Sequence, residues 1–203
     1  MANAFDSSDE EDRFAENDIQ TLKVDRLVLP HNIFADKGAV YLSGLPGCWF
    51  RNTHHLLQKD IDLLVQLGVT DAIVLLSKGE LRKYRSPSLL SVYLKHNIQV
   101  HYHPFEDGSA PSIDLAMNIL DKVFDLLQNG GRILIHCMSG VGRTGTIAAC
   151  LLQWLDEDLS PDASVVAVRS IRGNHAVHSV KQYNFVMEFR ERLAQERERS
   201  VSR

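Results

Sequence analysis

The sequence has few cysteines, little net charge and no long apolar run. Its three cysteines, Cys48, Cys137 and Cys150, are an odd number at unrelated spacings, which argues against a disulfide framework and against a zinc site. No run approaches the roughly 18 to 20 apolar residues that a membrane span needs, so we expect no membrane partner. The formal net charge of −4 includes no basic excess, and we therefore expect no nucleic-acid partner.

The start of the sequence, MANAFDSSDEED, lacks the basic residues and the apolar stretch of a secretory signal. We therefore expect an intracellular protein, located in the cytoplasm, around the nucleus or within it. In a reducing compartment, a cysteine that matters for function is expected to be a free thiol.

Composition divides the chain into three parts: an acidic tail predicted to be disordered (residues 1–20), one folded domain (residues 21–198) and a flexible tail (residues 199–203). The acidic character comes from Asp6 to Asp18, which has too few apolar residues to form a core. Within it, Ser7 and Ser8 each precede a glutamate by three positions. This spacing suits an acid-directed kinase and also a helix capping box, and both interpretations stay open.

Between the tails, apolar runs rich in β-branched residues alternate with segments of helical periodicity. This alternation is typical of α/β proteins, in which helices flank both faces of a central, mostly parallel, twisted sheet. The predicted strands are Ala39–Leu45, Asp71–Leu76, Gln99–Pro104 and Arg132–His136. The predicted helices are His54–Leu67, Ser88–His96, Ser112–Gln128, Thr144–Asp156, Pro161–Ile171 and Val180–Arg197.

The apolar run ILIHC delivers Cys137 to the carboxyl edge of the sheet, where α/β proteins bind ligands. Between this cysteine and Arg143, where a helical pattern begins, stand five residues: Met138, Ser139, Gly140, Val141 and Gly142. A short glycine-rich loop that enters a helix presents backbone N–H groups, and the helix N-terminus adds about half a positive charge. We therefore predict an anion cradle over residues 138–142, with Arg143 gripping phosphate oxygens through its planar fork.

In such a field the thiol of Cys137 is expected to ionise readily, because helix N-termini and cations stabilise thiolates. A thiolate beneath a bound phosphoryl group can attack phosphorus and form a phosphocysteine. Thr144 can donate a hydrogen bond to the sulfur when it leaves. Two alternatives account for less of the pattern. A cysteine that only fills space in the core leaves the glycine-rich loop and the arginine unexplained. A nucleotide-binding P-loop needs a lysine, which GRTG lacks.

The stretch HCMSGVGRTG resembles the HC-x5-R-[ST] signature of the cysteine-dependent protein tyrosine and dual-specificity phosphatases. The resemblance implies a protein tyrosine phosphatase-like fold of the dual-specificity type and a reaction without metal or other cofactor. It implies that Cys137 is the nucleophile, residues 138–142 the phosphate cradle, Arg143 the phosphate clamp and Thr144 the assisting hydroxyl. His136 is expected to support the loop by hydrogen bonds.

A leaving alkoxide needs a proton, so a carboxylic acid is expected near the cradle. The stretch VHYHPFEDGSAP places Glu106 and Asp107 in a turn at the same sheet edge. Similar phosphatases have an aspartate in this loop, so we favour Asp107, keep Glu106 as the second choice, and note that both can be solvated loop acids. His101 and His103 share a strand face, but no third ligand matches them, and we expect packed or hydrogen-bonded histidines.

The cradle contains no lysine, whereas phosphatases of inositol lipids often place lysines there to meet additional phosphates. The chain also shows no clear counterpart of the long tyrosine-recognition loop that deepens the pocket of tyrosine-specific enzymes. We therefore expect a shallower cleft that admits phosphoserine and phosphothreonine besides phosphotyrosine. Cys150 falls in an apolar helix and is expected in the core, while Cys48 stays unassigned.

Further stretches resemble the kinase-associated phosphatases within this superfamily: FDSSDEE, LPGCWF, GELRKYR, HYHPFEDGSAPSI, SIRGNHAVHSVKQYNFVMEFRERL and SVSR. The sequence departs from the family pattern in TGT after Arg143 and in HAVHS before KQYN, which puts loop rigidity or partner docking in doubt. The resemblance implies a substrate: the activation-segment phosphothreonine of a cyclin-dependent kinase, phosphorylated and free of its cyclin. It also implies docking by the C-terminal helix, where Lys181, Asn184 and Glu188 are the candidates.

Two other functions stay open. One is a kinase-binding inhibitory protein whose catalysis is incidental. The other is an RNA 5′-phosphatase, although the basic groove that RNA requires is not evident. The oligomeric state is also open, with a monomer as the expectation.

Overall fold

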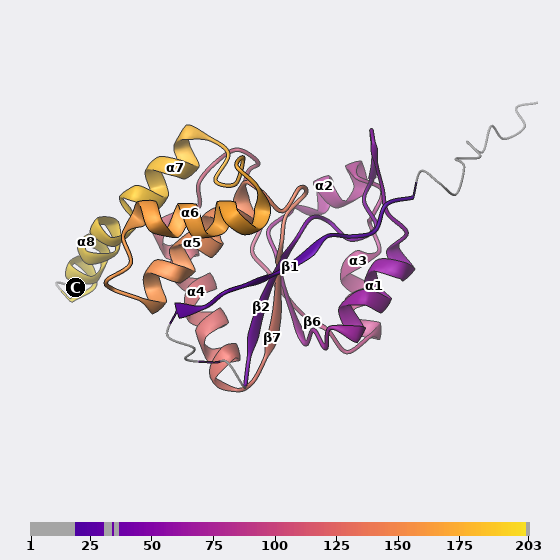
Figure 1. Cartoon of the computed structure of the whole chain (residues 1–203), viewed down its shortest axis with the longest axis horizontal. Helices are drawn as coiled ribbons and strands as arrows, with labels where there is room; N and C mark the ends of the chain where they lie inside the picture. The colour runs from indigo at the N-terminus through magenta and orange to yellow at the C-terminus, as the bar shows by residue number, and fades with distance from the viewer. Residues whose placement is uncertain (1–18, 31–33, 35–36, 202–203) are drawn as a thin grey trace, which may run out of the picture.

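The centre of the molecule is a twisted sheet of five strands, seen in a computed structural model that describes residues 19–30, 34 and 37–201 (Figure 1). The strand order is β1-β2-β7-β5-β6. All neighbours are parallel except β1, which pairs antiparallel with β2 at one edge. The strands are β1 Val24–Leu27, β2 Ala39–Ser43, β5 Asp71–Val74, β6 Gln99–Tyr102 and β7 Arg132–His136. The predicted α/β class with a mostly parallel sheet is confirmed.

The central strands are buried because helices cover both faces of the sheet. Successive side chains of a strand point to opposite faces. In β2, Val40 and Leu42 belong to one core, shared with α4 to α8, whereas Ala39 and Tyr41 belong to a second core, shared with α1 to α3. Figure 1 shows these two groups of helices on opposite sides of the sheet.

Serine side chains cap the N-termini of several helices. Ser112, Ser160 and Ser179 each accept a hydrogen bond from the backbone N–H three positions later, which satisfies an amide that the helix itself leaves unpaired. The helices are α1 Leu57–Gln66, α2 Lys78–Lys83, α3 Leu89–Lys95, α4 Ile113–Gln128, α5 Arg143–Leu155, α6 Pro161–Arg172, α7 Val180–Met187 and α8 Phe189–Val201.

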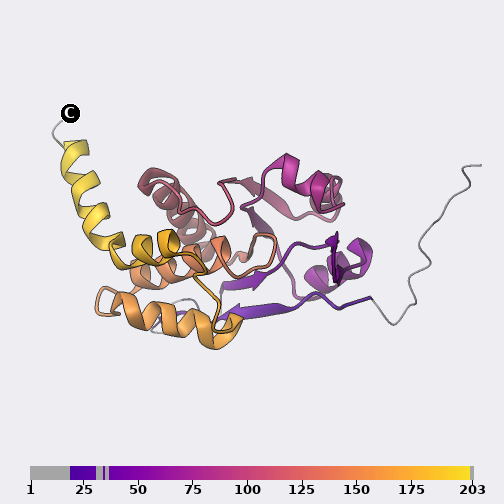
Figure 2. The same cartoon turned by 90° about the horizontal axis from the view of Figure 1, so that it is seen from above.

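The single helix predicted over Val180–Arg197 is wrong, because the structure divides it at Glu188 into α7 and α8. Figure 2 shows α8 turning away from the direction of α7. Phe185 and Phe189, on either side of the bend and with ring centroids 6.2 Å apart, pack into the same core, where neither is more than 1% exposed. Helix α8 continues to Val201, three residues into the segment 199–203 for which a flexible tail was predicted.

Three short features have no counterpart among the sequence predictions: strand β1, helix α2, and a hairpin of β3 Trp49–Phe50 and β4 Thr53–His54. Elements of two to six residues are too short to show a clear periodicity. The hairpin also shortens the predicted helix His54–Leu67, because His54 pairs with Trp49 and α1 begins only at Leu57.

Across the part of the chain that the structure describes, none of the helices combines the length and the apolar character needed to cross a bilayer. Residues 1–18 of the predicted acidic tail, with Ser7 and Ser8, lie outside the described residues. Gln20 is tied to the domain, since its backbone N–H donates to the carbonyl oxygen of His54 at 2.8 Å.

Candidate active site

Cys137 follows β7 directly, at the carboxyl edge of the sheet, and is 2% exposed. The chain then forms a loop over residues 138–142 and enters α5 at Arg143. Strand, loop and helix therefore follow one another as predicted. The cysteine and the arginine lie at the two ends of one short loop, which we call the cradle loop.

The cradle loop turns its carbonyl oxygens into the protein. All five accept hydrogen bonds from neighbouring segments. The backbone N–H of Leu45 donates to Met138 at 2.9 Å, and the guanidinium of Arg172 donates to Ser139 at 3.1 Å and to Gly140 at 3.0 Å. The backbone N–H groups of Val177 and Thr146 donate to Val141 at 3.2 Å and to Gly142 at 2.9 Å. Among the described residues, none of the loop's own N–H groups donates to a protein acceptor. These amides, at the N-terminus of α5, are thus available to an anion.

Gly140 is a position where the loop requires glycine. Its φ of +70° lies in the left-handed region that disfavours side chains. A Cβ atom there would also collide with the backbone carbonyl of Ser43 and with the guanidinium of Arg172. The two groups therefore pack closely against the cradle loop at this position.

Arg172, at the end of α6, links the cradle loop to the edge of the sheet. Its Nη1 lies 2.7 Å from Oδ2 of Asp25 in β1, and its side chain is 6% exposed. Its Nε and Nη2 donate to the carbonyl oxygens of Gly140 and Ser139. This supporting role was not predicted, because nothing in the sequence pattern brings residue 172 next to residues 139 and 140.

The guanidinium of Arg143 is fully buried and is held by three segments. Nη1 donates to the carbonyl oxygens of Leu75 and Phe105, both at 2.9 Å, while Nη1 and Nη2 donate to the carboxylate of Glu80 at 3.2 and 2.7 Å. Burial alone would lower the pKa of Arg143, but its hydrogen bond to the carboxylate of Glu80 and the charges of Cys137, Glu80 and Asp107 raise it. The cation is therefore retained, and its buried Nε has no acceptor in the part of the chain that the structure describes.

Glu80 is the functional candidate that sequence reasoning missed. It lies in α2, where Ser77 and Glu80 form a capping box: the hydroxyl of Ser77 accepts from the N–H of Glu80, and the carboxylate accepts from the N–H of Ser77. Burial raises the pKa of the carboxyl, but the hydrogen bonds and charge of Arg143 and the bonds of Ser77 outweigh it and lower the pKa. The spacing SKGE is a sequence signal for the cap, but the pairing with Arg143 depends on the fold.

Asp107 lies beside Arg143, with Oδ1 3.3 Å from Nη2, and its side chain is 63% exposed. The hydrogen bond from Arg143 to the carbonyl oxygen of Phe105 holds the same loop against the arginine. Glu106 is also exposed, and no ion pair joins it to Arg143 within the described residues. Of the two predicted acids, Asp107 is the one that reaches the arginine.

His136 and Thr144 flank the cysteine and arginine and are both buried. Nε2 of His136 lies 3.1 Å from the hydroxyl of Tyr93, and burial, together with the charge of Arg143, lowers the pKa of the imidazole to about 3. The imidazole is therefore neutral at physiological pH. The hydroxyl of Thr144 is buried and has no hydrogen-bond partner among the described residues, so it is available to a group that enters the site.

His101, His103, Cys150 and Cys48 were also singled out in the sequence, and each is held or buried within the fold. His101 is bound through Nε2 to Oδ1 of Asp71 at 2.7 Å, and burial lowers the pKa of His103. Cys150 is fully buried in α5, and burial raises its pKa well above the usual value. Burial and the charge of Asp60 raise the pKa of Cys48 to about 11. The described residues contain no group of three or more potential metal ligands.

The three residues predicted for docking lie on α7 and line one surface hollow of about 350 Å³. Ser109, Ala110 and Pro111, which follow directly after Asp107 and Gly108, line the same hollow. Glu188 also pairs with Arg192 at 2.6 Å. The structure thus brings Lys181, Asn184 and Glu188 together, next to the loop that carries Asp107.

Comparisons with known proteins agree with this geometry. The family model for cyclin-dependent kinase inhibitor 3 matches residues 1–165. A cyclin-dependent kinase inhibitor 3 of Rattus norvegicus is 38% identical, covering 96% of this chain and 90% of its own length. The Homo sapiens protein of the same name is 40% identical over 80% of this chain and 79% of its own.

Among solved structures, the fold matches a kinase-associated phosphatase in which the catalytic-site cysteine is replaced by serine. The TM-score is 0.81 at 36% identity, covering 86% of this chain and 97% of that one. The predicted resemblance to the kinase-associated phosphatases is confirmed. The chain belongs to the cyclin-dependent kinase inhibitor 3 family and is a cysteine-dependent dual-specificity phosphatase.

Proposed function

We propose that the chain removes phosphate from phosphothreonine, phosphoserine and phosphotyrosine through a phosphocysteine on Cys137. The observation that carries this proposal is the cradle loop, whose carbonyl oxygens are all bonded to the protein while its N–H groups have no protein acceptor among the described residues. A phosphoryl group bound by these amides sits above the buried sulfur and within the field of Arg143.

In the first step, the thiolate of Cys137 attacks phosphorus and the bond from phosphorus to the substrate oxygen breaks. Protonated Asp107 gives its proton to the departing oxygen, which leaves as an alcohol or phenol. The free Nε of Arg143 and the cradle amides bind the phosphoryl oxygens as their charge grows. In the second step, water attacks phosphorus and gives a proton to the carboxylate of Asp107, while the bond from phosphorus to sulfur breaks and inorganic phosphate is released. The hydroxyl of Thr144 donates a hydrogen bond to the thiolate that leaves.

The proposed substrate is the activation-segment phosphothreonine of a cyclin-dependent kinase that has released its cyclin, so that the enzyme would regulate the cell cycle. The names of the relatives support a kinase partner, and the cradle loop without lysine suits a singly phosphorylated side chain. A location in the cytoplasm, around the nucleus or within it, and a monomeric state stay predictions.

A docking surface for the intact kinase is proposed at the hollow lined by Lys181, Asn184 and Glu188. It adjoins residues 109–111, so a protein bound there lies next to the loop of Asp107. Reversing the charges of Lys181 and Glu188 should weaken activity on the intact kinase and spare a small aryl phosphate. Equal loss on both substrates would contradict docking at this hollow.

The decisive experiment measures phosphate release from the intact phosphorylated kinase and from its isolated activation-segment peptide, each with the wild-type chain and with Cys137→Ser. We expect faster release from the kinase, and none with the variant. Equal rates on kinase and peptide would keep the phosphatase and remove the dedicated kinase partner.

Two outcomes would favour the other functions. If Cys137→Ser still suppressed the kinase, the chain would act mainly as an inhibitory binding protein. If RNA with a 5′-triphosphate competed strongly with the phosphopeptide, an RNA 5′-phosphatase would be favoured. No release from either substrate with the wild-type chain would overturn the proposed reaction.

A further inference from the structure

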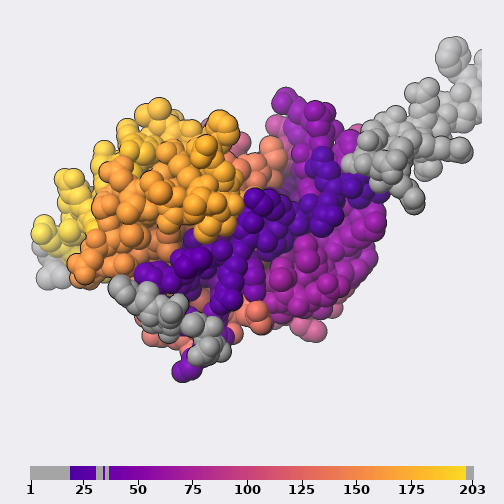
Figure 3. All heavy atoms as spheres, in the orientation of Figure 1, coloured from indigo at the N-terminus to yellow at the C-terminus, as the bar shows by residue number. Residues whose placement is uncertain are grey.

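The segment that leads into α7 contacts both loops of the candidate active site. We call residues 176–182 the entry segment; it joins the end of the turn after α6 to the first turn of α7. It contacts the cradle loop and the loop of Asp107, and the latter bonds link residues 71 and 73 positions apart. Figure 3 shows the gold and orange C-terminal elements, which include α7, facing the purple N-terminal elements across a hollow at the top of the molecule.

Ser179 and Gln182 hold the loop of Asp107 through two hydrogen bonds. The hydroxyl of Ser179 donates to the carbonyl oxygen of Gly108 at 2.7 Å. Nε2 of Gln182 donates to the carbonyl oxygen of Ser109 at 3.1 Å. The two acceptors are the first and second residues after Asp107, so the backbone that follows the proposed proton donor is bound to α7.

The backbone before Asp107 is bound as well. Nη1 of Arg143 donates to the carbonyl oxygen of Phe105 at 2.9 Å, and Nη2 lies 3.3 Å from Oδ1 of Asp107. The side chain of Asp107 is itself 63% exposed. The position of this carboxyl group therefore depends on the hydrogen bonds that hold the backbone on both sides of it.

The entry segment also contacts the cradle loop. The backbone N–H of Val177 donates to the carbonyl oxygen of Val141 at 3.2 Å. The side-chain amide of Gln182 packs against Gly142, where a Cβ atom would lie 3.1 Å from Oε1 and 3.2 Å from Nε2. Gln182 is fully buried, and a buried amide is costly unless its polar atoms are bonded. One side chain therefore touches the cradle loop and donates to the loop of Asp107.

Val177 adopts an unfavourable backbone conformation at this contact. Its φ of +56° lies in the left-handed region, which is unusual for a β-branched residue. The side chain is 3% exposed and packs into the core that includes Phe185 of α7. A strained conformation persists only where the surrounding structure imposes it, and such positions cluster at functional sites.

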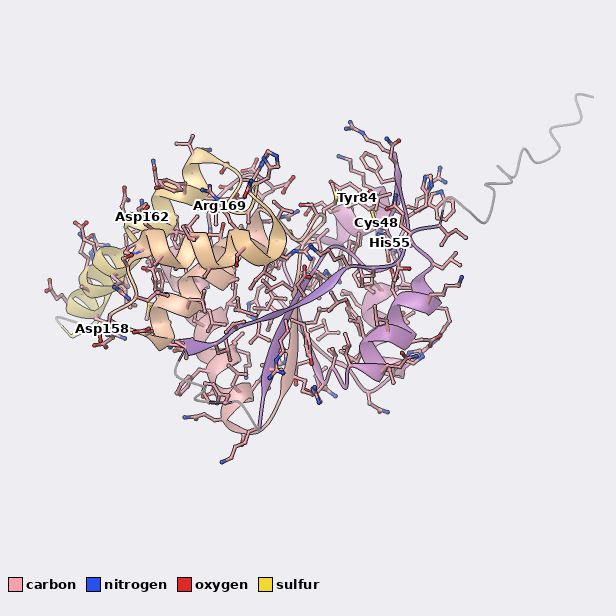
Figure 4. The ribbon with its side chains drawn as sticks, viewed as in Figure 1. Cys48, His55, Tyr84, Asp158, Asp162 and Arg169 are labelled. Atoms are coloured by element: carbon pink, nitrogen blue, oxygen red, sulfur yellow. The ribbon has the colours of Figure 1, made fainter. Side chains whose placement is uncertain are left out.

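Helix α6 supports the entry segment from the other side. Nε of Arg169 donates to the carbonyl oxygen of Ala176 at 3.1 Å, and the hydroxyl of Tyr183 donates to Oδ1 of Asp162 at 3.1 Å. Figure 4 labels Asp162 and Arg169 on α6, which packs beside α7. The entry segment is thus bound to a helix behind it and to two loops in front of it.

We propose that Ser179 and Gln182 are positioning residues, which fix the distance between the cradle loop and Asp107 and so let the acid reach the oxygen that leaves. The inference rests on the proposed function, in which Asp107 donates that proton. A proton donor must lie within hydrogen-bond distance of its acceptor, and a misplacement of about 1 Å can cost roughly 10²-fold in rate. Helix α7 therefore carries the candidate docking residues and also the support of the catalytic acid.

The first test measures kcat for a phosphothreonine peptide and for nitrophenyl phosphate with the full-length wild-type chain, Ser179→Ala and Ser160→Ala. Ser160 caps α6 as Ser179 caps α7, but within the described structure it has no hydrogen bond to the loop of Asp107, so it is the matched control. We expect Ser179→Ala to lower release from the peptide by roughly tenfold or more and release from nitrophenyl phosphate by less than about twofold, because only the alkoxide needs the proton. Ser160→Ala should leave both rates unchanged. Equal losses on the two substrates in Ser179→Ala would show a merely structural role and overturn the proposal.

Gln182→Glu tests the second bond and keeps the helix cap. A glutamate carboxylate can still accept from the N–H of Ser179, but it cannot donate to the carbonyl oxygen of Ser109. The readout is the ratio of the peptide rate to the nitrophenyl phosphate rate, because the added charge acts on the phosphoryl group of both substrates. We expect this ratio to fall as in Ser179→Ala, whereas Ser179→Thr, which retains the hydroxyl, should keep the wild-type ratio. A wild-type ratio in Gln182→Glu would contradict the proposal.

Double variants with Asp107→Asn separate a failure of this inference from a failure of the proposed reaction. If Ser179 acts through Asp107, adding Ser179→Ala to Asp107→Asn should lower release from the peptide no further. A further loss of the full factor would show that Ser179 acts in another way and would overturn the inference. A selective loss in Asp107→Asn beside an unaffected Ser179→Ala would remove this inference alone, whereas equal losses on both substrates in Asp107→Asn would remove the assignment of the acid as well.

Discussion

Glu80 and Arg143 form a two-point pair, in which the carboxylate accepts from Nη2 at 2.7 Å and from Nη1 at 3.2 Å. Together with the carbonyl oxygens of Leu75 and Phe105, the pair uses both terminal nitrogens of the guanidinium, and Nε has no acceptor within residues 19–30, 34 and 37–201. The carboxylate of α2 thus sets the orientation of an arginine that begins α5, although the two residues are 63 positions apart.

Glu80→Gln should therefore impair both stability and activity. The variant leaves a buried cation with only the exposed Asp107 as counter-ion, which we expect to cost about 1 to 3 kcal/mol in the free energy of unfolding. It should also lower kcat/KM, because the guanidinium loses its fixed plane. Urea unfolding and phosphate release measure the two effects. Glu106→Gln, an exposed acid without this pairing, is the control, and an equal loss there would refute a special role of Glu80.

Asp107→Asn removes the proposed proton donor. We expect release from a phosphothreonine peptide to fall by roughly 10²-fold or more, because an alkoxide leaving group needs the proton. A nitrophenyl phosphate, whose leaving group is stable as an anion, should be affected much less. If both substrates lost the same factor, the acid would have to be Glu106 or another group.

Gly140→Ala tests the packing behind the cradle loop, and Gly108→Ala is its matched control. Both glycines have φ near +70°, but a Cβ at Gly140 collides with Ser43 and Arg172, whereas one at Gly108 meets nothing within 4 Å. Gly108→Ala should cost about 1 kcal/mol from the backbone alone. Gly140→Ala should lower the urea midpoint much further. Similar urea midpoints for the two variants would mean that the cradle loop can shift to accommodate the added methyl group, which would contradict tight packing behind it.

His136 should make the protein sensitive to acid. Its pKa is about 3 in the folded chain and near the ordinary 6.5 when unfolded, so only the unfolded state gains this proton between those values. The contribution to stability is complete above pH 6.5 and is lost as the pH falls toward 3, by at most about 1.4 kcal/mol per pH unit. Urea unfolding at pH 7 and 4.5 should show a smaller decrease for His136→Gln than for the wild type. An equal decrease would place the acid sensitivity elsewhere.

The sequence by itself determined the fold class and the centre of the site. Buried parallel strands are read directly from apolar β-branched runs, and a strand, a glycine-rich loop and a helix that follow one another keep Cys137 and Arg143 together in any α/β fold. The helix Thr144–Asp156 was predicted within one residue at each end for the same reason, since its periodicity is local. The sheet strands, the cradle loop and this helix are predictable because each depends on residues that lie close together in the sequence.

Only the tertiary structure decided which distant side chains complete the site. Glu80 of α2 pairs with Arg143, and Arg172 of α6, itself paired with Asp25 of β1, binds the cradle loop. No local sequence pattern predicts these contacts. The break between α7 and α8 was equally hidden, because Phe185 and Phe189 satisfy a helical stripe whether or not the helix bends. Periodicity reports which face of an element is buried, whereas long-range packing decides what that face meets.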